Sequence, residues 1–108
     1  MPSKYQKETQ SLINILKHYE PEKIILFGSA VSKKNHAQSD IDVCLIKNFK
    51  SSRLKEKKKI FDLLWKRNFN YFFDPDIHLY QPSYFNAALK ENNPFVKEIN
   101  KGKVVYGK

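Results

Sequence analysis

Two short motifs of this chain carry residue types that suit phosphate and metal chemistry. Gly28-Ser29 follows an apolar run, and Asp40-Ile41-Asp42 opens a second apolar run after ten intervening residues. Residues i and i+2 of a strand point to the same face, so Asp40 and Asp42 are expected to project together. Neighbouring carboxylates repel each other unless a proton or a cation lies between them. Because Mg²⁺ prefers oxygen ligands, the pair predicts a site for a hard divalent cation of this kind.

The Gly28-Ser29 pair has the features of a phosphate-binding turn. A glycine lets the backbone approach a ligand closely, and the Ser29 hydroxyl can donate a hydrogen bond. We expect a short helix at residues 29–32, whose first N–H groups and positive dipole end favour a phosphate. A phosphate-binding turn beside paired carboxylates suits phosphoryl or nucleotidyl transfer. Gly28, Ser29 and Ser39, which precedes Asp40, are the nucleotide-binding candidates.

A third carboxylate is expected at the start of a later strand, because two metal ions normally need one more acidic ligand. Asp76 begins a predicted strand over residues 76–80, which can lie beside the strand of Asp40 and Asp42. Asp74 is the alternative, but it precedes a proline and is expected to lie outside the sheet. Asp40, Asp42 and Asp76 are therefore the candidates for catalysis and for binding two Mg²⁺ ions.

The composition limits the class of protein. At 108 residues, the chain is expected to form a single domain over residues 1–108. The single cysteine, Cys44, rules out an intrachain disulfide and lies in an apolar run, so we expect it to be buried. No apolar run reaches the roughly 18–20 residues that span a bilayer, and no signal peptide is evident. A cytoplasmic location is therefore expected.

The formal net charge is +9, which several kinds of partner could explain. Nucleic acid, nucleotide phosphates and an acidic protein all suit a basic chain, and a lysine-rich surface without a specific role is the simplest alternative. The basic residues are spread along the chain, and no aromatic-and-basic RNA-binding signature accompanies them. No zinc-ligand cluster, Ser–His–Asp or Cys–His arrangement is visible. His78 shares the predicted face of Asp76, and we interpret it as an ordinary strand histidine.

Helices and short strands alternate along the chain. Apolar residues at helical spacing predict a first helix over residues 3–19, which Pro21 ends. Strands are predicted at residues 23–27, 40–47 and 76–80, short helices from 82 and over 95–100, and a terminal strand or extended tail at 104–106. This order predicts an α/β (α+β) fold with a small mixed β-sheet and helices packed against it.

The helix predicted over residues 51–68 has two distinct faces. Ser51-Ser52 is expected to cap its start. Its predicted core stripe is Leu54, Ile60, Phe61, Leu64 and Trp65, and its other side carries Arg53, Lys55, Lys57, Lys58, Lys59, Lys66 and Arg67. A solvated face is the simpler interpretation of these basic residues, and a docking surface for an acidic partner or a phosphate is the alternative.

These motifs together resemble a known family. Leu26-Phe27-Gly28-Ser29, ten residues and Asp40-Ile41-Asp42 resemble the signature of the nucleotidyltransferase superfamily related to DNA polymerase beta. The small size, residues 76–80 with Pro82, and the final residues 102–106 look like its minimal, bacterial and archaeal branch. The resemblance covers nearly the whole chain.

The resemblance implies a nucleotidyltransferase fold and a division of roles among the candidate residues. Gly28 and Ser29 would hold nucleotide phosphates, Asp40 and Asp42 would bind metal, and Asp76 would complete the triad. Minimal members often act as antitoxins that pair with a helical HEPN-type toxin, and some transfer AMP from ATP to a tyrosine of that toxin. The resemblance therefore implies a Mg²⁺-dependent transferase with a HEPN-type partner.

The sequence departs from this family pattern immediately after Gly28-Ser29. Family members frequently carry an arginine and then a glycine there, whereas this chain reads Ala30-Val31-Ser32-Lys33. The contact to the triphosphate is then either missing or supplied by Lys33 or Lys34. Two alternatives to protein modification stay open. The first is a protein like the minimal nucleotidyltransferases (MNT) that has weak or no catalysis and neutralises a partner by stoichiometric binding. The second is nucleotidyl transfer to RNA or a small hydroxyl compound.

Overall fold

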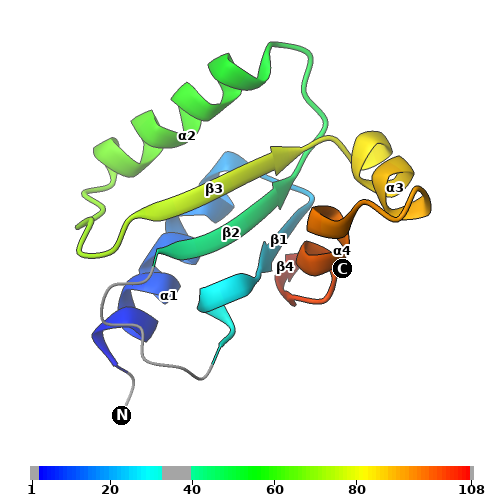
Figure 1. Cartoon of the computed structure of the whole chain (residues 1–108). Helices are drawn as coiled ribbons and strands as arrows, with labels where there is room; N and C mark the ends of the chain where they lie inside the picture. The colour runs from blue at the N-terminus through cyan, green and yellow to red at the C-terminus, as the bar shows by residue number, and fades with distance from the viewer. Residues whose placement is uncertain (1–2, 33–39, 108) are drawn as a thin grey trace.

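A four-stranded mixed sheet forms the centre of the structure, a computed structural model that describes residues 3–32 and 40–107 (Figure 1). The strands are β1 (Lys23–Leu26), β2 (Ile41–Ile46), β3 (Pro75–Tyr80) and β4 (Lys103–Gly107). Their order is β3-β2-β1-β4, with β1 antiparallel to β2 and β4 and with β2 parallel to β3. The mixed sheet confirms the predicted α+β class, and the C-terminal segment is a strand.

The helices cover both faces of this sheet. They are α1 (Lys4–Leu16), α2 (Arg53–Lys66), α3 (Pro82–Lys90) and α4 (Pro94–Asn100), with single 3₁₀ turns η1 (Lys17–Tyr19) and η2 (Gly28–Ala30). Ser3 and Gln6 form a capping box at the start of α1, and Ser52 caps α2 by accepting a hydrogen bond from the Lys55 N–H. No described helix is long and apolar enough to cross a membrane.

Side chains alternate across β2 and build two cores, one on each face of the sheet. Ile41, Val43 and Leu45 pack with buried residues of α1 and α2, whereas Cys44 and Ile46 pack with buried residues of α3 and α4. Cys44 is fully buried, as predicted, and burial raises the pKa of its thiol to about 12. The remaining position of β2 is Asp42, a half-buried charge on the α3/α4 face. This residue marks the part of that face that those helices leave open.

The predicted core stripe of α2 is partly wrong. Ile60 and Leu64 are fully buried, but Leu54 and Trp65 are 80% and 81% exposed and Phe61 is 40% exposed. The core-facing line of this helix starts instead at Glu56, four residues before Ile60 and only 4% exposed. The sequence pattern missed this line because a carboxylate is an unexpected core residue.

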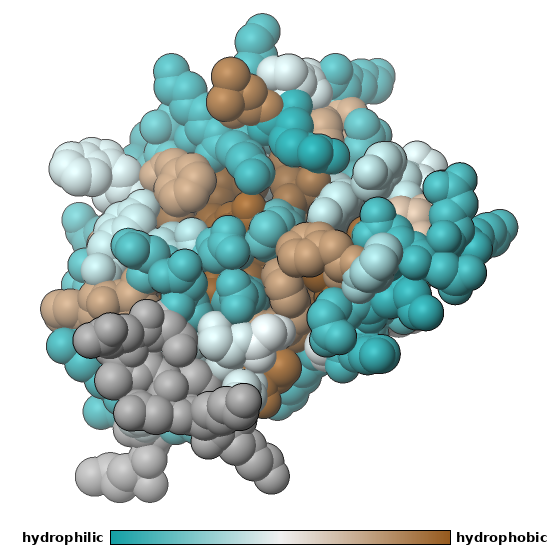
Figure 2. Space-filling model, viewed as in Figure 1, coloured by the Kyte–Doolittle hydropathy of each residue, from teal (hydrophilic) through white to brown (hydrophobic). Residues whose placement is uncertain are grey.

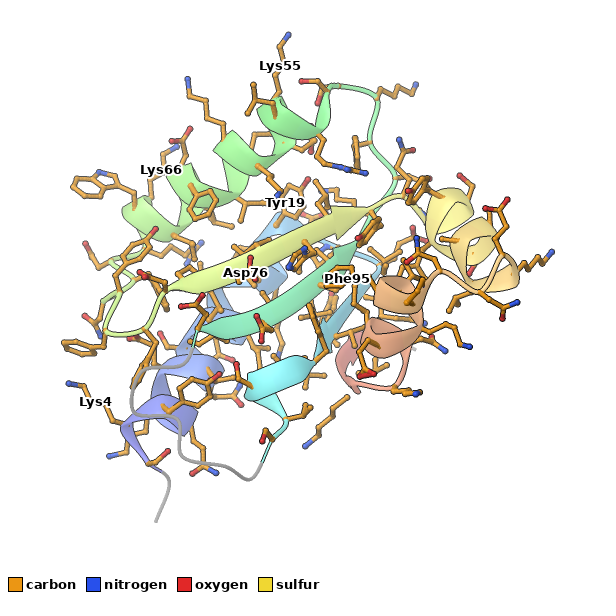
Figure 3. All side chains as sticks on the ribbon, viewed as in Figure 1. Lys4, Tyr19, Lys55, Lys66, Asp76 and Phe95 are labelled. Carbon is orange, nitrogen blue, oxygen red and sulfur yellow. The ribbon has the colours of Figure 1, made fainter. Side chains whose placement is uncertain are left out.

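Glu56 is stabilised in the core by three hydrogen-bond donors. The Tyr19 hydroxyl donates to one of its oxygens at 2.5 Å, and Ser51 and the Lys59 ammonium donate to the other, the latter at 2.9 Å. These bonds hold the pKa of Glu56 at about 2, well below its usual value. Burial and the same contact raise the pKa of Tyr19. Glu56 therefore anchors α2 to the end of α1, where Tyr19 lies (Figure 3).

Candidate active site

Gly28 brings the chain into direct contact with Asp42 at the end of β1. Its φ of +55° lies in the left-handed region, which L side chains rarely adopt. A Cβ at this position would lie 2.5 Å from the Asp42 Oδ2, closer than atoms can approach. A glycine is therefore required here both for its backbone conformation and for the space that it leaves to the carboxylate.

Ser29 donates to the carboxylate that Gly28 approaches. Its backbone N–H and its hydroxyl lie 3.1 and 2.9 Å from the Asp42 Oδ2, and the hydroxyl also lies 2.7 Å from the Asp40 carbonyl oxygen. A hydroxyl has one proton, so these two acceptors share it. The turn thus links the end of β1 to the start of β2.

The helix expected after Gly28 is only the 3₁₀ turn η2. Its amides are used locally: the Ala30 and Val31 N–H groups donate to the Phe27 and Gly28 carbonyls at 3.1 and 3.2 Å. A single turn carries little of the dipole expected for a longer helix, so that part of the sequence argument was wrong. The donors in position at this turn are the N–H and hydroxyl of Ser29.

Asp42 and Asp76 are direct neighbours on adjacent parallel strands, where they form one register pair of β2 and β3. Neighbouring strands lie about 4.8 Å apart, and paired residues point to the same face. The Asp76 side chain is 49% exposed, and its Oδ2 lies 3.2 Å from the His78 Nε2. Asp42 therefore accepts hydrogen bonds from Ser29, and Asp76 has the His78 imidazole beside it.

The other two candidate aspartates, Asp40 and Asp74, lie just before β2 and β3. Asp40 is exposed, and its carbonyl accepts hydrogen bonds from Ser29 and from the Tyr5 hydroxyl, the latter at 2.7 Å. Asp74 is also exposed, and its carbonyl accepts from the Ile41 N–H at 2.9 Å. Asp74 thus lies outside the sheet, as the sequence predicted, whereas Asp76 lies opposite Asp42. Ser39, Lys33 and Lys34 lie outside the described residues.

Tyr5, a buried residue of α1, also contacts this site through its hydroxyl group. Burial raises the pKa of its phenol, the Ser29 hydroxyl opposes that shift, and the negative charges of Asp42 and Asp40 add to it. The phenol therefore stays protonated and can donate to the Asp40 carbonyl. No sequence signal marks this contact, because its two residues are 35 positions apart.

The oxygen donors of this site suit a hard divalent cation. Asp42 and Asp76 present carboxylates on one face, and the Gly28 approach leaves room for the Asp42 carboxylate. Among the described residues, however, no three His, Cys, Asp or Glu side chains are grouped closely enough to hold a metal ion. The geometry therefore provides a two-carboxylate centre, with Asp40 at its margin.

An aromatic wall, formed by Phe27, His78 and Phe95, borders the carboxylates on the same side of the sheet. The His78 ring centroid lies 5.0 Å from that of Phe95 and 5.5 Å from that of Phe27, and Phe95 is 44% exposed. Asp76 and Phe95 can be followed in Figure 3, one on β3 and the other at the start of α4. His78 links the two parts, since it contacts both Asp76 and Phe95.

A separate cavity of about 700 Å³ lies on the other side of the η2 turn. It is lined by residues of α1, by Ala30, Val31 and Ser32, and by Lys101, Gly102 and the first residue of β4, Lys103. None of the three candidate aspartates lines it. The cavity therefore borders the turn but is not the carboxylate centre.

A family model matches most of the chain. The model of the polymerase beta nucleotidyltransferase family matches residues 10–108, which include every candidate from Gly28 to Asp76. The chain therefore belongs to this family. Comparison of the sequence with curated proteins gives no match.

Two solved structures share the nucleotidyltransferase fold of this chain. One is a complex of a tri-AMPylated Shewanella oneidensis HEPN toxin with MNT antitoxin: the TM-score is 0.52 and the identity 16%, over 96% of this chain and 73% of the other. The second is a mutant of the toxin–antitoxin MntA–HpeT, with a TM-score of 0.51 and 16% identity over 93% and 73%. At this identity the likeness establishes the fold.

Proposed function

We propose that this chain is a Mg²⁺-dependent nucleotidyltransferase that moves AMP from ATP to a hydroxyl group of a HEPN-type protein. The observation that carries the proposal is the Asp42–Asp76 register pair beside the Gly28-Ser29 turn. This arrangement combines paired carboxylates with N–H and hydroxyl groups that can donate hydrogen bonds to a phosphate. All of them lie near the starts of β2 and β3. In this role the chain acts as the antitoxin of a toxin–antitoxin pair.

The residues divide into phosphate-binding and metal-binding groups. Gly28, Ser29 and Ser39 bind the nucleotide phosphates. Asp42 and Asp76, with Asp40 at the margin, would hold Mg²⁺, which would neutralise charge on the phosphates and lower the pKa of the acceptor hydroxyl. These roles are assigned from the family resemblance, supported by the positions of Gly28, Ser29, Asp42 and Asp76 at one site.

The transfer forms one bond and breaks another. The acceptor oxygen bonds to the α-phosphorus, the bond from that phosphorus to the bridging oxygen breaks, and pyrophosphate leaves. We assign Asp76 the role of receiving the acceptor proton, a role that its 49% exposed side chain supports. His78 then holds Asp76 in position through its ring nitrogen.

The partner assignment rests on a structural likeness. The similar complex joins a tri-AMPylated HEPN toxin with an MNT antitoxin, and we extend that pairing to this chain. An acidic protein partner also suits the net charge of +9.

Transfer of label from ATP tests the proposal. The chain is incubated with α-labelled ATP, Mg²⁺ and the HEPN-type protein encoded beside it, and the label on that protein is measured. We expect Asp42→Ala to reduce the labelling rate by at least about 100-fold, because it removes a carboxylate that holds the metal. Glu91→Gln, an exposed carboxyl outside the site, serves as the control. No transfer, or equal transfer by Asp42→Ala, would overturn the proposal.

A second candidate function is neutralisation of the partner by binding alone. It is favoured because the described side chains form no three-ligand metal group and because Ala30 and Val31 replace the residues common in the family. In that case the partner forms a stable complex and loses its toxicity without label, and Asp42→Ala leaves both effects unchanged.

A further inference from the structure

The outer face of α2 exposes large apolar side chains that the fold does not need. Leu54, Phe61 and Trp65 are spaced by seven and four residues, so they lie on one side of the helix. Leu54 and Trp65 are about as exposed as surface lysines, at 80% and 81%. We call these three side chains the α2 stripe. Isolated exposed apolar residues are common, but an aligned set on one helix marks an interaction surface.

The stripe borders a hollow with an apolar floor. Leu54, Phe61, Lys55, Lys57 and Lys58 line a space of about 570 Å³ on the outer face of the helix. In Figure 2, brown and tan side chains emerge among teal ones in the upper part of the view, where α2 lies in Figure 1. The helix is fixed beneath the hollow by Ile60 and Leu64, which are fully buried.

Positive charge surrounds the stripe. Seven basic residues lie on α2 and at its C-cap: Arg53, Lys55, Lys57, Lys58, Lys59, Lys66 and Arg67. Of the two acidic residues in α2, Glu56 is buried and Asp62 is exposed. Lys55 points away from the sheet (Figure 3). A partner must therefore offer apolar side chains together with carboxylates.

We propose that the α2 stripe is the docking surface for an acidic amphipathic helix of the HEPN-type partner. The inference rests on the proposed function, because that function supplies the helical partner. An apolar side chain of the docked helix fills the hollow, and its flanking carboxylates pair with Lys57 and Lys58. The fit uses both properties of the surface, its aligned apolar residues and its charge.

Other occupants use only part of this surface. A second copy of the chain would bring another basic α2 against the first, and these helices repel each other. A nucleic acid would bind the lysines through its phosphates and leave the hollow beside Leu54 empty. A lipid bilayer would take up the stripe, but Lys58 lies among the stripe residues, where its charge opposes insertion into hydrocarbon.

The position of α2 relates docking to catalysis. β3 is an edge strand of the sheet, and α2 precedes it in the chain. The end of α2 that carries Trp65 lies toward the start of β3, where Asp76 is found (Figure 1). The carboxylates lie on the α3/α4 face of the sheet, whereas α2 covers the other face. A protein held along α2 must therefore reach past the edge strand β3 to position an acceptor hydroxyl at the carboxylate centre.

Trp65 itself reports whether the surface is covered. It is the only tryptophan of the chain, so its emission can be followed while the HEPN-type partner, with any tryptophan replaced by phenylalanine, is titrated in. We expect a blue shift of the emission maximum and protection from acrylamide quenching. Leu54→Ser and Lys58→Glu should each weaken the complex by about tenfold or more. Tyr84→Ser and Lys90→Glu, exposed residues of α3, are the matched controls and should leave affinity unchanged.

The outcomes separate this inference from the proposed function. Label transfer without a shift of the Trp65 emission would overturn the docking surface and support the transferase function. A shift without label transfer would support the docking surface and overturn the transferase function. If the partner produces no shift, the inference is overturned when a shift appears with anionic phosphatidylglycerol vesicles or when the concentration of the chain alone is raised. Equal loss of affinity in the α2 and α3 variants also overturns it.

Discussion

At the scale of single residues, the contact between Gly28 and Asp42 gives the site its geometry. The glycine adopts a left-handed conformation, and the space of its missing side chain is taken by the Asp42 carboxylate. Ser29 then donates twice to that same carboxylate. The motif order in the sequence predicted that these residues would meet. It could not predict that both Ser29 donors would point to the Asp42 carboxylate.

Gly28→Ala should destabilise the protein for two separable reasons. The φ of +55° costs an alanine about 1–2 kcal/mol, and the clash with Asp42 adds to that loss. Urea unfolding of Gly28→Ala, Asp42→Ala and the double variant forms a cycle that separates the two effects. We expect the glycine substitution to cost less in the Asp42→Ala background. An equal cost in both backgrounds would mean that the close approach does not exist.

At the scale of elements, α2 shows where a helical pattern misleads. Its apolar residues fall on two sides of the helix, and the sequence pattern predicted that both sides face the core. Ile60 and Leu64 are in the core, but Leu54 and Trp65 are exposed. The choice between the sides depends on Tyr19, which lies 37 residues before Glu56 and donates a hydrogen bond to it. Helical periodicity alone carries no information about that partner.

Replacement of Glu56 by glutamine should weaken this anchor and change the acid stability. The folded-state pKa of about 2 lies below the ordinary value of 4.5, so the ionised form is favoured by folding. Its contribution is fully present above pH 4.5 and is lost as the pH falls toward 2. We expect Glu56→Gln to cost about 1–3 kcal/mol at pH 7 and to lose less stability than the wild type between pH 5 and 2.

Urea unfolding at a series of pH values measures both effects, with Glu91→Gln as the exposed control. If the wild type and Glu56→Gln lost stability in parallel down to pH 2, the hydrogen bonds of Glu56 would not favour its ionised form.

At the scale of the whole molecule, strand pairing assembles the site from distant parts of the chain. Short runs rich in apolar residues predicted β1, β2 and β3, because buried strands show such runs in the sequence. They left open whether the C-terminal residues form a strand or a tail. The parallel register that places Asp76 opposite Asp42 needs the tertiary structure. The same is true of the wall formed by Phe27, His78 and Phe95, since α4 must fold back onto the sheet to bring Phe95 there. The sequence therefore indicates which residues are candidates for the site, but not which other residues contact them.

Binding of Mg²⁺-ATP to the chain alone tests the central claim most directly, because it depends on the site and on no partner. Isothermal titration calorimetry compares the wild type, Asp42→Asn, Asp76→Asn and the Glu91→Gln control, with and without Mg²⁺. We expect binding that requires the cation and that weakens by at least about tenfold in both aspartate variants, because each removes a charged metal ligand. Equal affinity in all four proteins, or binding independent of Mg²⁺, would contradict the assignment of these carboxylates.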